Sequence, residues 1–156
     1  MKKKILVAID DSENALRAVE FVADTFNPPH RITLFSVIPD TAFVCDMHSP
    51  ELTPYFLSQR DVFCSIEDKK RDLIEGAIKK AKEILTKAGF EERNIEVKIG
   101  TKKSGVARDI ITEANLGYDI VVLGKRGLSG IKEFFIGSVS QKVINSVKDV
   151  SVLLVN

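Results

Sequence analysis

The sequence predicts an α/β fold, a Rossmann-like three-layer open sandwich in which helices cover both faces of a five-stranded parallel sheet. Two observations carry this prediction: short apolar runs alternate along the chain with segments whose apolar residues recur every three or four positions. The runs are typical of covered strands, and the segments are typical of amphipathic helices. Because strands that alternate with helices are joined by right-handed crossovers, the sheet is expected to be parallel.

The first part of the chain contains two expected strands and one helix. Residues 5–9 form a continuous apolar run, and the Asp-Asp-Ser turn at 10–12 ends this run and offers caps for a helix. Helical spacing of apolar residues then extends from 12 to 26, where an Asn-Pro-Pro sequence stops it. A second apolar run, at 32–38, ends before a proline and predicts the second strand.

The segment 39–66 shows no convincing period and contains two further prolines after the one that opens it. Connections without secondary structure are uncommon in compact domains once they exceed about 12–15 residues. We therefore expect a functional flap, an interface arm or partly helical structure. Two functions stay open at this point, a lid over a bound ligand and an arm that contacts a second subunit.

The clearest helix in the sequence spans residues 67–88 and ends before a glycine. Its Lys/Glu-rich face is expected to face solvent. The expected core face consists of Leu73, Ala77, Ala81, Ile84 and Ala88.

The remaining elements continue the same alternation of strands and helices. Residues 95–99 alternate between apolar and charged side chains, as a half-covered strand at the edge of a sheet would. The other expected elements are a helix at 104–117, a strand at 119–123, a helix at 137–147 and a strand at 151–155.

Length and charge exclude several classes of protein. The 156 residues fit a single domain spanning 1–156, and the net charge of +1 gives no electrostatic reason to expect nucleic-acid binding. No apolar stretch reaches the roughly 18 residues that a membrane span needs. The apolar run behind the N-terminal lysines is too short for a secretory signal, so a cytoplasmic protein is expected.

The two cysteines offer no metal-binding pattern. Cys45 and Cys64 form no C-x-x-C motif, and neither His30 nor His48 has a partner at metal-ligand spacing. We therefore expect the cysteines to be free thiols in a reducing compartment.

A glycine motif follows the strand expected at 119–123. Gly124 and Gly127 stand three apart, and nine residues separate Gly127 from Gly137 and Ser138, where a helix is expected to begin. Glycines let backbone N–H groups approach an anion, and a helix N-terminus offers unpaired donors and a partial positive charge. Asp10 also follows a strand end, and ligands of open α/β sheets bind beyond the carboxyl ends of the strands. The sequence therefore predicts a nucleotide site.

These motifs resemble those of the universal stress protein family over nearly the whole chain. The stretch from Val7 to Glu13, VAIDDSE, is similar to the first strand and acidic turn of that family, and G-x2-G-x9-G-S is similar to the pattern of its ATP-binding branch. Asp11 stands where many members carry Gly. The resemblance implies the strand order 3-2-1-4-5, a nucleotide between strands one and four, and a homodimer formed through residues 151–155.

The glycine loop supplies the expected phosphate contacts. Gly127 would donate its backbone N–H, and Gly137 would allow close approach at the helix start. Alternatively, both glycines only shape a turn. Ser138 and Ser140 carry hydroxyls for phosphate oxygens or for a bound Mg²⁺ or Mn²⁺, unless they only cap the helix. The ligands of such a metal are not assigned.

Asp10 occupies the place of the acidic nucleotide contact in the resembled family, where a carboxylate would bind ribose or base; its alternative role is a helix cap. Val37 resembles the position whose backbone meets adenine, and its side chain is typical of a core. Gly124 is expected beside the ribose, or simply at the end of a strand. Lys125 and Arg126 would neutralise phosphate charge, although such side chains more often face solvent.

An ATP-binding regulatory, stress-response homodimer fits the sequence best, with ATP, ADP or AMP as the bound nucleotide. A phosphohydrolase is the alternative, but P-loop enzymes use a lysine that this glycine motif lacks, so hydrolysis should be slow or depend on a partner. A flavin carrier is less favoured, because Asp10 and Asp11 stand where an FMN phosphate would lie and would repel it. No catalytic residue is assigned.

Overall fold

The computed structural model describes residues 1–47, 53–125 and 136–156. Its five strands form one sheet in the order β3-β2-β1-β4-β5, and all neighbouring strands are parallel. The predicted fold class and strand order are therefore confirmed. The strands are β1 (Lys4–Ala8), β2 (Arg31–Ile38), β3 (Ile95–Thr101), β4 (Ile120–Gly124) and β5 (Ser151–Val155).

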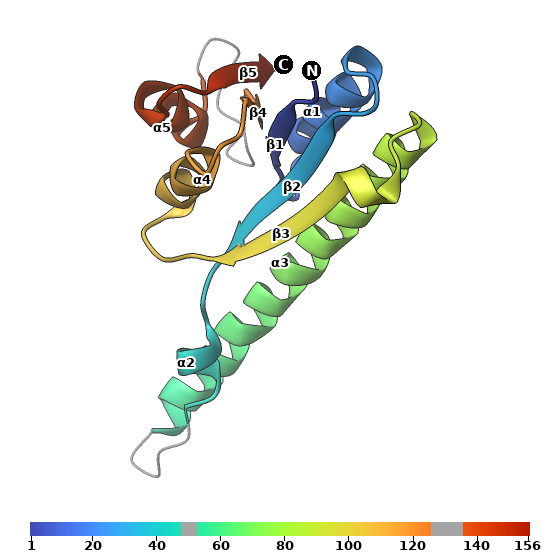
Figure 1. The fold of residues 1–156 in the computed structure, drawn as a ribbon. Coiled ribbons are helices and arrows are strands. Elements are labelled where there is room, and N and C mark those ends of the chain that lie inside the picture. Colours follow the sequence, from blue (N-terminus) through green and yellow to red (C-terminus); the bar gives the residue numbers. More distant parts are fainter. Residues whose placement is uncertain (48–52, 126–135) are drawn as a thin grey trace.

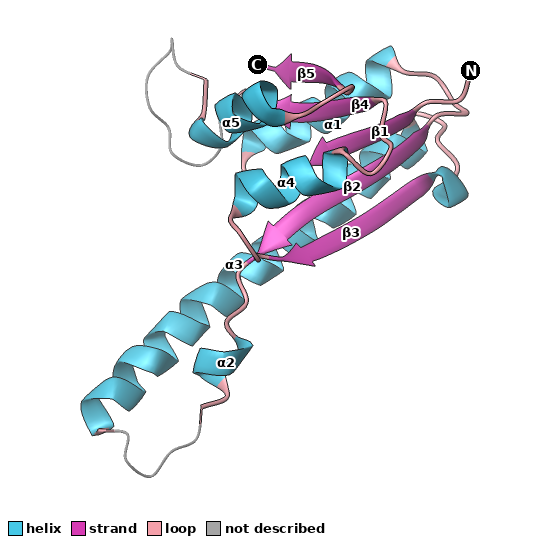
Figure 2. Ribbon diagram, turned by 60° about the vertical axis from the view of Figure 1, so that its left-hand side comes forward, coloured by secondary structure: helices cyan, strands magenta, loops and turns pink. Residues whose placement is uncertain are grey.

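Helices cover both faces of this sheet (Figure 2). On one face α1 (Glu13–Thr25) packs beside α3 (Pro54–Lys87), and on the other α4 (Val106–Ala114) packs beside α5 (Ser138–Ser146). The described residues also form a short helix, α2 (Ala42–Cys45), and a 3-10 turn at Glu92–Asn94. In the described part of the chain, none of the helices combines the length and apolar character that crossing a membrane requires.

The central strand β1 shows why the sheet needs both helix layers. Ile5, Leu6 and Val7 are completely buried. Successive side chains of a strand point to opposite faces, so Ile5 and Val7 join the core under α1 and α3, while Leu6 joins the core under α4 and α5. The continuous apolar run in the sequence is the signature of this two-sided burial.

Helix α3 differs from its prediction in length and in its buried face. It starts at Pro54, where Thr53 caps it through the Phe56 N–H at 3.3 Å. Proline is tolerated in a first helical turn, so Pro54 begins the helix and does not interrupt it. Leu73 and Ala88, expected in the core, are exposed, and the buried positions are Ile74, Ala77, Ile78, Ala81 and Leu85.

The extra turns of α3 run past the sheet and carry α2 beside them (Figure 1). Cys45 of α2 and Cys64 of α3 form a disulfide with a Cα–Cα distance of 5.9 Å. The expectation of free thiols is therefore wrong. Nothing in the sequence brings the two cysteines together, because their proximity depends on residues 54–66 being helical. The disulfide fixes α2 to the projecting part of α3.

Asp119 ties the start of β1 to the start of β4. Its carboxylate accepts hydrogen bonds from the Lys4 backbone N–H at 2.8 Å and from the Lys3 ammonium at 3.0 Å. These bonds favour the ionised carboxylate and hold the pKa of Asp119 below its usual value. The interaction therefore stabilises the fold fully above the pKa of an unfolded aspartate and loses that effect as the pH falls through the lower folded pKa.

We expect Asp119→Asn to lower the free energy of unfolding at pH 7, with a difference from wild type that shrinks as the pH falls below about 4. Urea unfolding at a series of pH values measures both quantities. Asp24→Asn, on the exposed side of α1, is the matched control and should show a small difference that does not vary with pH. A constant difference for Asp119→Asn would contradict the assigned cause.

Candidate functional site

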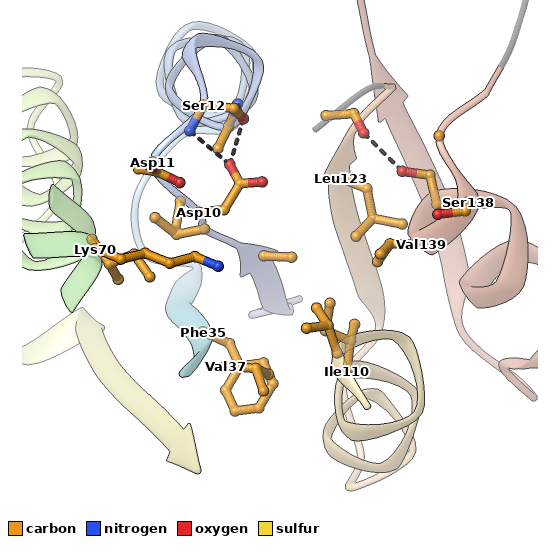
Figure 3. Close-up of a pocket in the computed structure, with 18 residues that line it drawn as sticks. Asp10, Asp11, Ser12, Phe35, Val37, Lys70, Ile110, Leu123, Ser138 and Val139 are labelled. Atoms are coloured by element: carbon orange, nitrogen blue, oxygen red, sulfur yellow. Dashed lines mark hydrogen bonds between the residues drawn. The ribbon is translucent and has the colours of Figure 1, made fainter. Parts of the chain in front are cut away.

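A cavity of about 310 Å³ opens beyond the carboxyl ends of β1 and β4, at the point where the strand order reverses (Figure 3). Asp10 and Gly124, which the sequence places directly after two expected strands, both line this cavity. Its volume is within the range of small-molecule sites. The described residues that line it come from β1, β2, β4, α1, α3, α4 and α5 and from the turns between them.

One part of the cavity is apolar. Phe35 and Val37 of β2 lie across from Leu123 of β4, while Ile110 and Val139 come from α4 and α5. Phe35, Ile110 and Leu123 are buried, and Val37 and Val139 are half-buried. An apolar wall of this kind suits a flat aromatic or heterocyclic group better than an ion.

The acidic turn after β1 forms a second wall. The Asp10 carboxylate accepts a hydrogen bond from the Ser12 backbone N–H at 2.9 Å, and the same Oδ1 accepts from the Ser12 hydroxyl. The Ser12 hydroxyl in turn caps α1 by accepting from the Ala15 N–H at 3.2 Å. Ser12 is therefore the helix cap, and the second oxygen of Asp10 takes no part in these bonds.

Asp11 adds a polar atom without a partner. Its Oδ1 is buried, and no described group of the protein hydrogen-bonds to it. Buried polar atoms are nearly always hydrogen-bonded in folded proteins, so an unpaired one that lines a cavity is a natural contact for a donor group of a ligand or for water.

The N-terminus of α5 forms the opposite wall. Gly137 caps this helix without a side-chain hydrogen bond, and its own N–H donates to the Lys125 carbonyl at 2.8 Å. The first intrahelical bond runs from the Gln141 N–H to the Gly137 carbonyl. The preceding N–H groups, those of Ser138, Val139 and Ser140, are the donors that a helix leaves unpaired at its start. They suit a phosphate group.

Gly124 and Ser140 fix the start of α5 and the first turn of α1 close to the end of β4. The Ser140 hydroxyl is buried and donates to the Gly124 carbonyl at 2.9 Å, which ties α5 to the end of β4. A methyl group on Gly124 would come within 3.0 Å of backbone and side-chain atoms of Asn14 in the first turn of α1. Gly124 therefore permits close approach of α1 to β4, a role that differs from the turn or ribose contact expected for it.

Lys70 is a lining residue that sequence reasoning missed. It stands on α3, among charges that were expected to face solvent, yet its side chain points into the cavity (Figure 3). It is the cationic side chain among the described lining residues. Lys70 stands one turn before Ile74, the first buried residue of α3, and local spacing does not distinguish it from the neighbouring solvent-facing charges.

The remaining predicted site residues lie in or next to the glycine loop. Gly127 and Arg126 fall outside the described residues. Lys125 is half-buried, and its backbone N–H donates to the Val155 carbonyl at 2.7 Å, which continues the pairing of β4 with β5. Among the described residues no group of three or more His, Cys, Asp or Glu side chains is placed to hold a metal ion.

The sequence of this chain is similar to those of one known protein family. The model of the universal stress protein family matches residues 1–156. A relative of that description from Staphylococcus haemolyticus is 24% identical over 144 residues, which cover 91% of this chain and 78% of the relative. A second relative, from Staphylococcus saprophyticus, is also 24% identical and is covered over 77% of its length.

Several solved structures share the fold. The hypothetical protein MJ0577 aligns with a TM-score of 0.73 and 24% identity, covering 99% of this chain and 96% of that one. The UspA protein of Lactobacillus plantarum gives 0.68 and 19%, covering 99% and 97%. A universal stress protein in complex with cAMP gives 0.64 and 18%, with the same coverage. At these identities the likeness supports the fold alone.

Proposed function

The chain belongs to the universal stress protein family, and on that premise we propose that it is an ATP-binding member that acts as a nucleotide-dependent regulatory homodimer. One observation carries the proposal: the cavity at the switch point joins an apolar wall, an acidic turn and the start of a helix. These three surfaces match the base, the ribose and the phosphates of a nucleotide.

The nucleoside is assigned to the side of the cavity nearest β2. The base would lie against Phe35, Val37 and Ile110, with the backbone of Val37 as its polar contact. Asp10 has one carboxylate oxygen engaged by Ser12, so its other oxygen would accept from ribose hydroxyls. The similar fold of a universal stress protein in complex with cAMP supports the choice of an adenine nucleotide.

The phosphates are assigned to the start of α5 and the glycine loop. The unpaired N–H groups at Ser138, Val139 and Ser140 and the helix dipole favour negative charge there. Gly124, Gly127 and Gly137 would leave the backbone open to close approach. Lys125 and Arg126 would lie beside the loop.

A divalent cation, Mg²⁺ or Mn²⁺, would be held mainly by phosphate oxygens. The described side chains provide no complete ligand set, but Asp10 and the hydroxyl of Ser138 line the cavity and would contact the ion or its waters. Bound in this way the ion would neutralise phosphate charge that faces Asp10 and Asp11.

The homodimer is assigned to β5, the outermost strand beside β4. Val152, Leu153 and Leu154 are only half-buried, although apolar. An edge strand presents unpaired backbone groups, so an apolar one is a ready surface for pairing with a second copy across a two-fold axis.

The direct test is mass spectrometry of the purified protein after denaturation, followed by calorimetry with ATP, ADP, AMP, GTP and FMN. We expect an adenine nucleotide to be released, and adenine nucleotides to bind in preference to the others with a micromolar Kd, which corresponds to about −8 kcal/mol. A yellow protein or tighter binding of FMN would contradict the assignment. Multiple-turnover phosphate release from the pure protein would instead favour the ATPase alternative.

Replacing Lys70 by Met should weaken ATP binding several-fold, or by about 1 kcal/mol, because the variant keeps the apolar stem of the side chain and loses its hydrogen-bonding cation. Titration calorimetry measures the change. Lys79→Met, at an exposed position of the same helix, is the matched control and should leave the affinity unchanged. Equal affinities for the two variants would remove Lys70 from the site.

A further inference from the structure

The part of α3 from Tyr55 to Leu73 carries large apolar side chains to solvent. Tyr55 is 75% exposed, Val62 58%, Ile66 57% and Leu73 59%. Figures 1 and 2 show the first turns of α3 running past the sheet, where the helix layers of the body do not cover them. Leu73 lies further along the helix, next to Ile74, its first buried residue, and is still exposed. Single exposed apolar residues are normal on protein surfaces, but several along one helix indicate a contact surface.

These four side chains lie on one line along the helix. Together with Gln59 and Lys69, which are also exposed, they follow alternating steps of four and three residues. This is the spacing of the a and d positions of a coiled coil, a stripe narrow enough for one neighbouring helix. We call this stripe the arm seam; it consists of Tyr55, Gln59, Val62, Ile66, Lys69 and Leu73.

The disulfide fixes α2 away from the arm seam. Val62 and Ile66 stand two residues before and after Cys64, which at 3.6 residues per turn places them on the opposite side of the helix from it. Cys64 is bonded to Cys45 of α2. The short helix therefore covers the side of α3 that faces away from the seam.

We propose that the arm seam pairs with the arm seam of a second copy of this chain, with the two helices antiparallel. Apolar and polar positions follow one another in the same order from either end of the seam. In the antiparallel register Val62 therefore faces Ile66 of the second copy, and Tyr55 faces Leu73 of the second copy. Each apolar side chain of the seam then packs against an apolar side chain of the second copy. A helix of unrelated sequence would not necessarily present apolar side chains at these positions. The contact is separate from the β5 pairing and does not depend on nucleotide binding.

Charge also favours a second copy. Residues 54–73 carry four Lys or Arg side chains and four Asp or Glu side chains, so two such helices do not repel each other. With no net charge, this stretch gives no electrostatic reason to expect nucleic acid or an anionic membrane surface as its partner.

The two polar seam positions fix the alignment. In the antiparallel register Gln59 faces Lys69 of the second copy, so an amide oxygen meets an ammonium donor, and the same pair recurs on the other side of the two-fold axis. Slipping the helices by one turn would place these polar groups against apolar side chains. Polar residues in a coiled-coil seam are known to select the register in this way.

Cross-linking of introduced cysteines tests the pairing. Ser65 flanks the seam next to the two-fold axis, so Ser65→Cys in one copy lies beside Ser65→Cys in the other. A short bis-maleimide should link the full chain into a covalent dimer, and the native cysteines stay unreactive because they are paired. Ser58→Cys is the matched control: it flanks the same side of the seam, but its two copies are separated by about 18 Å along the helix axis.

We expect efficient linking of Ser65→Cys, little linking of Ser58→Cys, and loss of the Ser65→Cys product when Val62→Glu and Ile66→Glu are added. Circular dichroism and an unchanged melting temperature of the body would show that the charged variant is folded, since both positions are exposed. No covalent dimer, equal linking at both positions, or linking that survives the two glutamates would each overturn the proposal. A variant with β5 blocked by Leu153→Lys should still link at Ser65→Cys.

Discussion

Replacing Ser138 by Glu should weaken ATP binding at least a hundredfold, which corresponds to about 2.8 kcal/mol, while adenosine binding changes little. The added carboxylate would lie at the first residue of α5, among the N–H groups assigned to the phosphates. It would repel the phosphates and compete for those donors. Titration calorimetry with ATP and adenosine separates the two effects.

The structure of the Ser138→Glu variant should be preserved, because acidic side chains in the first turn of a helix interact favourably with its dipole. Gln141→Glu is the matched control: it adds the same charge to an exposed position of the same helix, outside the set of residues that line the cavity. We expect near-normal ATP binding in the control. An equal loss of adenosine and ATP in Ser138→Glu would mean that α5 does not bind the phosphates.

The parts of the fold that the sequence predicted best are those where one periodicity dominates. The apolar runs at β1 and β5 and the edge position of β3 follow from local pattern, and each is confirmed. The turn at 10–12 offered several caps for α1, and the structure shows that Ser12 is the one used. For segment 39–66 the expectation of partly helical structure is confirmed by α2 and the first turns of α3, but the local pattern did not give the bounds of these helices. The apolar residues on the outer part of α3 face solvent, so they do not mark a core-facing stripe, and the proline at 54 begins the helix.

The sequence predicted those residues of the site that directly follow strands of the sheet. Asp10 and Gly124 follow neighbouring strands of the sheet, and parallel strands bring their carboxyl ends together at one edge. Lys70 was not predictable, because its contact with the cavity depends on the path of α3 past β2. The disulfide was missed because the contact between Cys45 and Cys64 depends on residues 54–66 being helical, which their spacing in the sequence did not show.

The role of Gly124 also depends on contacts in three dimensions that residue spacing in the sequence does not reveal. A Cβ at this position would approach the C, O and Cβ atoms of Asn14 to 3.0 Å, which is tighter than nine in ten real Cβ contacts, so these atoms would have to move by a few tenths of an ångström. Asn14 belongs to the first turn of α1, two residues after the Ser12 cap and close to Asp10. An added methyl group therefore displaces α1 and, with it, the acidic wall of the cavity.

We expect Gly124→Ala to lower the free energy of unfolding by about 1–3 kcal/mol, as overpacking of a well-packed interior does, and to weaken ATP binding in the folded protein. Gly76→Ala gives the matched control. Gly76 lies within α3 with no atom near its missing Cβ, so the same substitution there should stabilise the protein by about 0.5–1 kcal/mol through helix propensity. Urea unfolding of the two variants should thus give shifts of opposite sign. Stabilisation by both would show that α1 adjusts freely, and that the close approach at Gly124 does not constrain the site.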